Sequence, residues 1–247
     1  MRETKIVDFL SKIKKDKTIY LDIETVPFVT YEELCNNPAH AEAKQLWDKR
    51  TLLRLKKGDI EQGLSEKEIW ESAALYPEYN KLVCICIGFL LNGKYTEREF
   101  VNDNEEQLIV DFLYAITYLQ IKNKFETIIG ANIDGFDLPV LFRKAIIYGY
   151  SPTPLISEYD RKPWDDKNCD ITKVWRRGSF NGDATIASIC RMLKMPSPKT
   201  DDIDGSKIYG FYLNGEVDKI VKYCHADVKA LYYIVNYLSN LKVFVIL

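Results

Sequence analysis

The dipeptide Asn92-Gly93 separates two segments that have the composition of β-strands, LVCICIGFLL at residues 82–91 and KYTEREFV at residues 94–101. Asn-Gly suits the left-handed backbone of a type I′ turn, so the two segments are predicted to pair as a β-hairpin. A third run, TIYLDIET at residues 18–25, is also rich in β-branched and apolar residues. The chain is therefore expected to fold around a sheet.

Helical and strand patterns alternate after the hairpin. The spacing of apolar residues predicts helices at 105–120, from Asp137 to near Gly149, at 170–175, at 183–192 and at about 216–238, with a short strand at 127–130. Strands that are followed by alternating strands and helices favour an α/β fold, in which helices cover a mixed sheet.

Three other regions differ in composition. Residues 31–80 are charged and contain two segments with helical spacing, which predicts a helical insertion after the first strand. Residues 151–167 contain three prolines and are expected to be irregular, and residues 195–207 are expected to form a mobile loop. With 247 residues, 47% of them apolar, the chain can bury a full core, and a single domain over residues 1–247 is the simplest organisation.

Composition argues against several classes of protein. The apolar runs are far shorter than the ~20 residues that span a bilayer, and the N-terminus lacks the apolar core of a secretory signal, so we expect a cytoplasmic protein without a membrane span. A net charge of −2 is not the footprint of a protein that binds nucleic acid by charge alone. Lys173, Arg176 and Arg177 form a compact basic run that could contact phosphate, although a solvated helix face is the commoner explanation.

The six cysteines include no CxxC pair, and the chain has only two histidines, so the sequence offers no zinc-binding spacing. Reduced and mostly buried thiols are the expected state. These residues are Cys35, Cys84, Cys86, Cys169, Cys190 and Cys224, with His40 and His225.

Two segments place carboxylates where core residues are expected. In an extended strand, Asp22 and Glu24 share one face with Tyr20, opposite an apolar face. An edge strand with one wet face is the alternative. In the final helix, Asp227 falls inside the apolar stripe, and an unpaired buried ion costs several kcal/mol. Tyr223 lies one turn before Asp227, although a core aromatic is the simpler role for one of sixteen tyrosines.

A third segment, GANIDGFDLPVL, ends a predicted strand and places Asp137 before Leu138-Pro139. Taken alone, this position favours Asp137 as a helix N-cap. Asp134 is expected to form a turn with Gly135.

In this order, the three segments resemble the three motifs of DEDD-type 3′→5′ exonucleases of the tyrosine subclass. LDIET is similar to the first motif, NIDGFD to the second, and YCHAD to the third. The chain also resembles stand-alone exonucleases related to the editing domain of family B DNA polymerases, from Thr18 to about Leu238. The resemblance implies an RNase H-like fold with a mixed five-stranded sheet, and the insertion at residues 31–80 departs from a minimal exonuclease domain.

The resemblance also implies a mechanism. Asp22, Glu24, Asp137 and Asp227 would hold two divalent ions, Mg²⁺ or Mn²⁺, because an all-oxygen ligand set suits hard cations. Tyr223 would orient the attacking water, and Asn132 and Phe136 would contact the terminal nucleotides, although Phe136 is as readily a packing residue. The substrate implied is an unpaired 3′ end, with DNA favoured and nucleoside 5′-monophosphates released.

Three other functions compete with this interpretation. An exoribonuclease would use the same fold and the same acids. A non-catalytic nucleic-acid-binding protein on this fold is a second alternative, since fold alone does not establish function. A small-molecule-binding α/β protein is disfavoured, because no Gly-rich phosphate loop follows a predicted strand.

Overall fold

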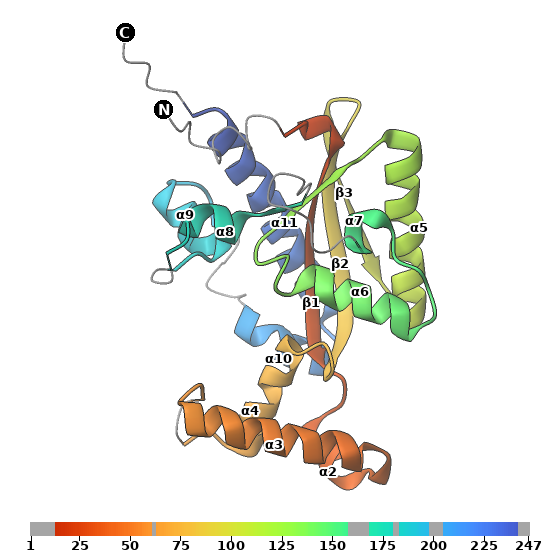
Figure 1. The fold of residues 1–247 in the computed structure, drawn as a ribbon, viewed down its shortest axis with the longest axis vertical. Coiled ribbons are helices and arrows are strands. Elements are labelled where there is room, and N and C mark those ends of the chain that lie inside the picture. Colours follow the sequence, from red (N-terminus) through yellow and green to blue (C-terminus); the bar gives the residue numbers. More distant parts are fainter. Residues whose placement is uncertain (1–12, 61–62, 158–167, 180–182, 198–204, 242–247) are drawn as a thin grey trace.

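The computed structural model describes residues 13–60, 63–157, 168–179, 183–197 and 205–241. A five-stranded sheet forms its centre, with the strand order β3-β2-β1-β4-β5 (Figure 1). Its strands are β1 (Thr18–Pro27), β2 (Asn80–Leu91), β3 (Lys94–Val101), β4 (Thr127–Gly130) and β5 (Cys169–Asp170). β1 pairs antiparallel with β2 and parallel with β4, so the predicted mixed sheet is confirmed.

The predicted hairpin is also confirmed. Asn92 and Gly93 connect β2 to β3 with φ angles of 52° and 77°, the left-handed conformation that a type I′ turn requires at both central positions. β2 begins at Asn80, before the predicted start of this strand, and the two-residue β5 was not predicted.

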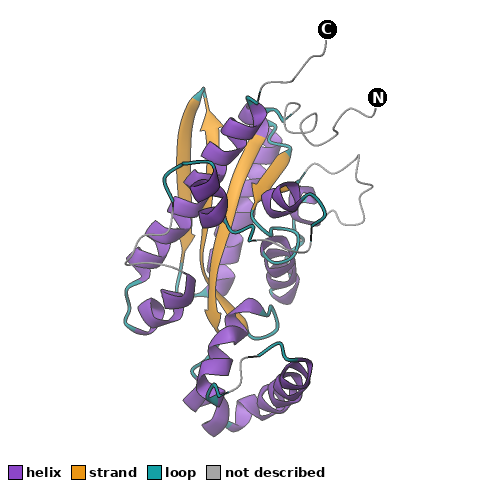
Figure 2. Cartoon of the chain, turned by 90° about the vertical axis from the view of Figure 1, so that its left-hand side faces the viewer, coloured by secondary structure: helices purple, strands orange, loops and turns teal. Residues whose placement is uncertain are grey.

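Helices cover both faces of the sheet (Figure 2). On one face, α5 (Glu105–Asn123), α6 (Asp137–Ile147) and α7 (Pro154–Ser157) pack on Ile19, Leu21 and Ile23 of β1. On the other face, α8 (Ile171–Arg176), α9 (Ile186–Met192), α10 (Ile208–Leu213) and α11 (Val217–Ser239) pack on the side of β1 that carries Tyr20 and Val26. The alternation of β1 therefore separates two apolar cores.

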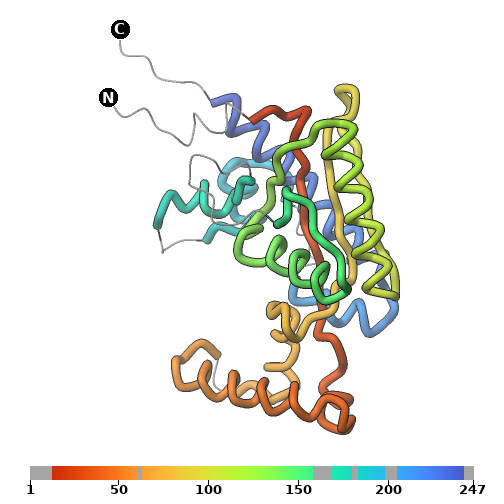
Figure 3. Tube along the Cα trace, turned by 45° about the vertical axis from the view of Figure 1, so that its right-hand side comes forward, coloured from red at the N-terminus to blue at the C-terminus, as the bar shows by residue number. Residues whose placement is uncertain are grey.

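The predicted insertion is helical. It consists of α2 (Tyr31–Asn36), η2 (Pro38–His40), α3 (Ala41–Lys57), α4 (Glu66–Glu71) and η3 (Ser72–Leu75). These elements build a third apolar cluster around Trp47 and Trp70, both of which are almost fully buried. The insertion lies at the end of the sheet opposite to the start of β1 and the C-terminal end of α11 (Figure 3).

Some expectations need correction. The short helix α7 lies in the region expected to be irregular, and α10 was not predicted. Within the loop predicted at residues 195–207, residues 205–207 form a 3₁₀ turn, η4 (Gly205–Lys207), while residues 198–204 lie outside the described part, as do residues 158–167. Another 3₁₀ turn, η1 (Lys15–Lys17), precedes β1. No helix in the described ranges combines the length and the apolarity needed to cross a bilayer.

Candidate active site

The strand that carries Asp22 and Glu24 is central, so the alternative of an edge strand is wrong. β1 is paired on both sides, with β2 and with β4. Across the antiparallel ladder, Asp22 lies opposite Cys86 and Glu24 lies opposite Cys84. Because side chains alternate along a strand, both acids point to the face that α11 covers.

Helix α11 supplies the next two candidate residues. Asp227 lies inside the buried stripe and is 7% exposed, and Tyr223, one turn earlier, is 8% exposed. Carboxylate oxygens of Asp22, Glu24 and Asp227 lie within 4.8 Å of one another. Residues that are two hundred positions apart in the chain thus form one compact group of acids.

Asp137 joins this group from the start of α6. Phe136 occupies the N-cap position and Asp137 is the first helical residue, so the N-cap interpretation of Asp137 is wrong. The Asp137 side chain is 4% exposed, and its carboxylate accepts hydrogen bonds from its own backbone N–H and from the N–H of Ile23 on β1. The bond to Ile23 holds the start of α6 against the strand that carries the other acids.

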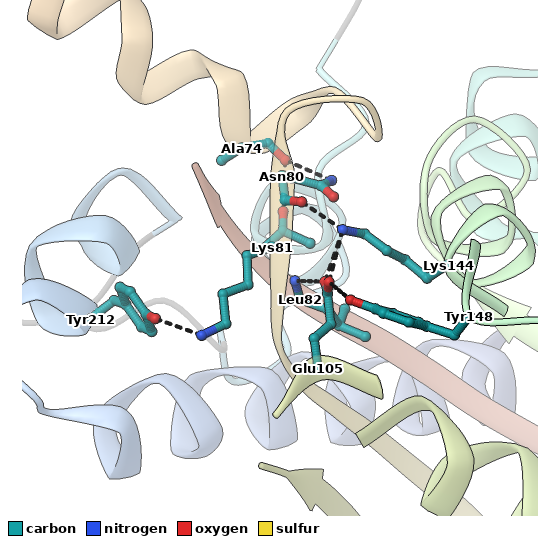
Figure 4. Close-up of polar contacts among 9 residues, drawn as sticks. Ala74, Asn80, Lys81, Leu82, Glu105, Lys144, Tyr148 and Tyr212 are labelled. Carbon is teal, nitrogen blue, oxygen red and sulfur yellow. Dashed lines mark hydrogen bonds and ion pairs between the residues drawn. The ribbon is translucent and has the colours of Figure 1, made fainter. Parts of the chain in front are cut away.

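A buried polar network fixes α6 at its other end (Figure 4). Lys144 donates to the backbone carbonyl of Asn80 at 2.6 Å and forms an ion pair with Glu105 at 2.9 Å. Glu105 also accepts hydrogen bonds from the Tyr148 hydroxyl and from the backbone N–H of Leu82, each at 2.6 Å. These contacts tie α6 to α5 and β2, and so they set the position of Asp137.

Burial dominates the electrostatics of the acids. Loss of solvation raises the pKa of Asp22 well above its ordinary value, and the charges of Asp227, Glu24 and Asp137 raise it further. Burial likewise raises the pKa of Glu24, with Cys84 and Asp227 as the next causes. Burial raises the pKa of Asp137 to about 7, against the effect of its two backbone hydrogen bonds. The group cannot be fully ionised at neutral pH without a counter-charge.

These raised pKa values predict an unusual pH dependence for the metal-free protein. Between pH ~4, the pKa of an acid in the unfolded chain, and its raised pKa in the folded state, the acid is ionised when unfolded but protonated when folded. For Asp137 the folded-state pKa is about 7. The folded state then binds more protons, so the free energy of unfolding should fall as pH rises through this window. For each such acid, the free energy of unfolding is expected to fall by about 1.4 kcal/mol per pH unit.

Urea unfolding in EDTA at several pH values between 4 and 8 measures this effect. The Asp137→Asn variant should show a flatter profile than the wild type. A wild-type stability that increased steadily over the same range would contradict the prediction.

Tyr223 contacts the acids through its hydroxyl. Burial raises the pKa of Tyr223 above its ordinary value, followed by the charges of Asp227, Glu24 and Asp22 and by a hydrogen bond with Asp227. A Cβ atom at Gly205 would lie 3.9 Å from this hydroxyl, so η4 also reaches the group. The hydroxyl therefore faces the carboxylates and keeps its proton at neutral pH.

The loop before α6 is held by two residues that the sequence patterns did not single out, Asp170 and Thr172. Asn132 adopts a left-handed conformation, with φ 57°, and its backbone N–H donates to Oδ1 of Asp170 at 3.0 Å and to Oγ1 of Thr172 at 2.9 Å. Asp170 also caps α8, where it accepts from the N–H of Thr172. An Asp just before a helical segment signals a cap, but nothing local indicates that the cap binds a distant loop.

The remaining predicted residues of this loop have separate roles. Asp134 lies in the predicted turn and forms an ion pair with Lys173 at 2.6 Å, so that lysine already has a partner. The side chain of Asn132 lies over Gly135, where a Cβ atom would be 2.5 Å from its Oδ1. Phe136 is partly buried and packs against the core on the α5 and α6 side.

Three of the cysteines converge beside the acids, on the same face of the sheet. The sulfur atoms of Cys84, Cys86 and Cys224 lie within 4.8 Å of one another, although no motif in the sequence links them. Sγ of Cys224 donates to the backbone carbonyl of Asp22 at 3.3 Å, and Sγ of Cys86 donates to the carbonyl of Val221 at 3.9 Å. Five of the six cysteines are buried and free, as expected, while Cys35 is exposed. The thiols therefore pack against the strand that carries Asp22 and Glu24.

Comparison with solved structures supports the predicted fold class. The chain is similar to a family B DNA polymerase from the hyperthermophilic archaeon Pyrobaculum calidifontis, with a TM-score of 0.53 and 15% sequence identity. The similarity covers 90% of this chain and 24% of that chain, so this chain spans about a quarter of the polymerase's length. At this identity the likeness concerns the fold alone. No curated protein matches the chain.

A family model matches residues 76–242, about two thirds of the chain. The match includes Asp137, Tyr223 and Asp227, and it begins after the strand that carries Asp22 and Glu24. The family is described as a predicted 3′-5′ exonuclease related to the exonuclease domain of PolB. With its mixed sheet and the order of its motifs, the chain belongs to this family of 3′→5′ exonucleases.

Proposed function

We propose that the whole chain is one exonuclease domain that uses two divalent ions to remove nucleoside 5′-monophosphates from the unpaired 3′ end of DNA. The observation that carries this proposal is the group of buried acids, in which three carboxylates lie within 4.8 Å. Such a group is destabilising by itself, because buried like charges lack the solvation that water provides.

The residues present fit a pair of hard cations. The ligand set of Asp22, Glu24, Asp137 and Asp227 contains only carboxylate oxygens, which suits Mg²⁺ or Mn²⁺ rather than zinc. In addition, Oδ2 of Asp22 is buried and makes no hydrogen bond to any described residue. When bound, two such ions acidify the attacking water and neutralise the charge that develops on the scissile phosphate.

Each acid receives a role within this proposal, following the resemblance to the family's motifs. Asp22 would be a ligand shared by the two ions, Glu24 and Asp227 would complete the site at which water is activated, and Asp137 would help to hold the second ion. The close packing of Cys84, Cys86 and Cys224 beside Asp22 and Glu24 supports an ordered arrangement, since close-packed side chains leave the strand little freedom.

Tyr223 acts as a positioning group. Because its raised pKa keeps the hydroxyl protonated, Tyr223 orients the water by a hydrogen bond and does not accept its proton. Asn132 and Phe136 lie on the loop that precedes α6, where they would meet the terminal nucleotides. Phe136 is only partly buried, so part of its side chain stays open to a base.

The acids are recessed between β1 and α11, so the substrate that can reach them is an unpaired 3′ end. A duplex end must first lose pairing and stacking, which costs a few kcal/mol, whereas a single strand does not. Single-stranded DNA should therefore be cut faster than blunt duplex, and we expect DNA to be preferred to RNA because the motifs resemble those of polymerase editing domains.

A competition assay tests this function. Single-stranded DNA, RNA of the same sequence and blunt duplex DNA, each labelled at the 3′ or the 5′ end, are digested with Mg²⁺ at fixed salt, because phosphate binding varies steeply with ionic strength. Equal rates on duplex and single strand would contradict the unpaired-end argument. Faster decay of RNA would favour an exoribonuclease, and release from the 5′ end would overturn the polarity.

A further inference from the structure

The insertion is a rigid body attached beside the acids. Its cluster around Trp47 and Trp70 is closed by aromatic contacts, and Nε1 of Trp70 donates to the carbonyl of Val29 at 2.9 Å. The hydroxyl of Thr25, the residue after Glu24, donates to the carbonyl of Ala74 in η3 at 2.7 Å. The insertion therefore has a fixed position relative to the strand that carries Asp22 and Glu24.

Helix α3 presents a strongly basic surface on this body. Trp47 is its one buried residue, so most of the helix surface is open. Its second half, KRTLLRLKK at residues 49–57, contains five basic residues and no acid, in a chain whose net charge is −2. The second half of α3 is thus a locally basic segment in a chain with a slightly negative net charge.

The cations of α3 fall into two groups. Arg50 and Arg54 lie over the ring of Tyr76, with the guanidinium carbons 4.1 and 5.3 Å from its centroid, and so they help to anchor the helix. Lys49, Lys56 and Lys57 are exposed and form no ion pair with any described residue. These three ammonium groups are available to a ligand.

Apolar side chains lie among the free lysines. Leu46, Leu52 and Leu53 are between 48% and 59% exposed, which is unusual for so many leucines on one helix. A surface that combines cations with apolar side chains matches a nucleic-acid strand, in which phosphates alternate with sugars and bases. Simple solvation would account for the lysines but not for the leucines.

We propose that α3 binds the phosphodiester backbone of the substrate strand on the 5′ side of the scissile end. This inference rests on the proposed nuclease function and adds a second contact surface to it. Figure 1 shows α3 extending from the end of the sheet toward the side on which α8 and α9 lie, beyond the end of β1. A strand whose 3′ end reaches the acids can thus continue across the insertion, where Lys49, Lys56 and Lys57 bind its phosphates.

Substrate length separates this role from the chemistry. A dinucleotide contains a single phosphodiester, the one that is cut, so it has no phosphate left for α3. The variant K49Q/K56Q/K57Q should therefore cut a dinucleotide at the wild-type rate, whereas its kcat/KM on a single strand of about thirty nucleotides should fall by about 10–100-fold at moderate salt.

The matched control removes three other exposed lysines. K94Q/K122Q/K124Q has the same change in net charge, but Lys94 follows the hairpin turn and Lys122 and Lys124 lie at the end of α5, so they are remote from the insertion. This control should behave as the wild type on both substrates. Equal losses for the two triple variants would show that total charge, rather than α3, matters.

A binding measurement keeps the inference separate from the activity. Fluorescence anisotropy with a labelled single strand, in EDTA and at several salt concentrations, gives the slope of log Kd against log salt. This slope should be smaller by about 2 in K49Q/K56Q/K57Q than in the wild type, because each phosphate contact on a single strand contributes about 0.7. An unchanged slope would overturn the proposal even if the protein proved to be a nuclease. If the wild type cut no substrate but showed this slope change, the surface would stand and the proposed chemistry would fail.

Light scattering tests the alternative that α3 binds a second copy of the protein instead of nucleic acid. The wild type is expected to be a monomer at micromolar concentration. A wild-type dimer that became monomeric in K49Q/K56Q/K57Q would assign α3 to self-association and overturn the proposal.

Discussion

Replacing Asp22 or Asp227 by alanine is expected to lower the nuclease rate by at least about 10³-fold, while the protein stays folded. Both carboxylates belong to the group whose oxygens lie within 4.8 Å, and each is proposed to hold metal rather than to fill the core. Single-turnover digestion of end-labelled single-stranded DNA measures the rate, and circular dichroism checks the fold.

The same substitutions should stabilise the protein when metal is removed. Burial and three neighbouring carboxylates raise the pKa of Asp22, so deleting this acid relieves a cost that the metal-free protein carries. We expect the free energy of unfolding in EDTA to rise by about 1–2 kcal/mol. Asp218→Ala is the matched control, because Asp218 is an exposed acid of the same helix, α11, and its removal should leave the rate unchanged and should not raise the stability. Wild-type activity in Asp22→Ala would refute the assignment.

Removal of divalent ions is the second change expected to have a large effect. Excess EDTA should reduce the rate by at least about 10³-fold, and Mg²⁺ or Mn²⁺ should restore it, whereas Zn²⁺ should do so poorly because the ligands are all carboxylate oxygens. Full activity in excess EDTA would exclude the proposed mechanism.

Thermal unfolding provides a readout of ion binding that does not depend on activity. An ion that binds only the folded state stabilises it by about 2.7 kcal/mol at a hundred times its dissociation constant. Mg²⁺ should therefore raise the melting temperature of the wild type and have little effect on Asp22→Ala. A similar rise in both proteins would place the ion elsewhere.

The parts of the fold that follow from local patterns could be predicted. The hairpin was marked by Asn92-Gly93, whose left-handed backbone few other dipeptides adopt, and α11 by a long apolar stripe. The burial of Asp227 could also be expected, because this carboxylate falls inside the apolar stripe of the final helix.

Contacts between distant segments could not be predicted in this way. β5 has two residues, too few for any periodicity, and it exists because the carbonyl and amide groups beside β4 need partners. In the sequence, Asp170 looks like any other helix N-cap. Its hydrogen bond from the backbone N–H of Asn132 depends on how the segment after β4 packs against the start of α8. The convergence of the three thiols likewise depends on the register between β1, β2 and α11.

The insertion was expected to be helical, but its basic surface was not predicted. Helical spacing in residues 41–57 indicates the helix. Which of its cations are engaged and which are free depends on Tyr76, whose ring contacts the arginines and which lies after the next helix in the chain. Conversely, Lys173 belongs to the compact basic run that the sequence does mark, and the structure pairs it with Asp134. Charge in the sequence therefore indicates how many cations there are, and tertiary contacts decide which of them are free.

The attachment of the insertion has an evolutionary consequence. Pro27 at the end of β1 pairs with Asn80 at the start of β2, and the N–H of Phe28 bonds to the carbonyl of Tyr79 at 2.9 Å. Residues 28–79 thus leave and rejoin the sheet at adjacent positions, where a hairpin turn of a few residues would serve equally well. Such a module can be gained, lost or exchanged in one genetic event without disturbing the strands that hold the acids. Members of this family are therefore expected to differ in length at this junction.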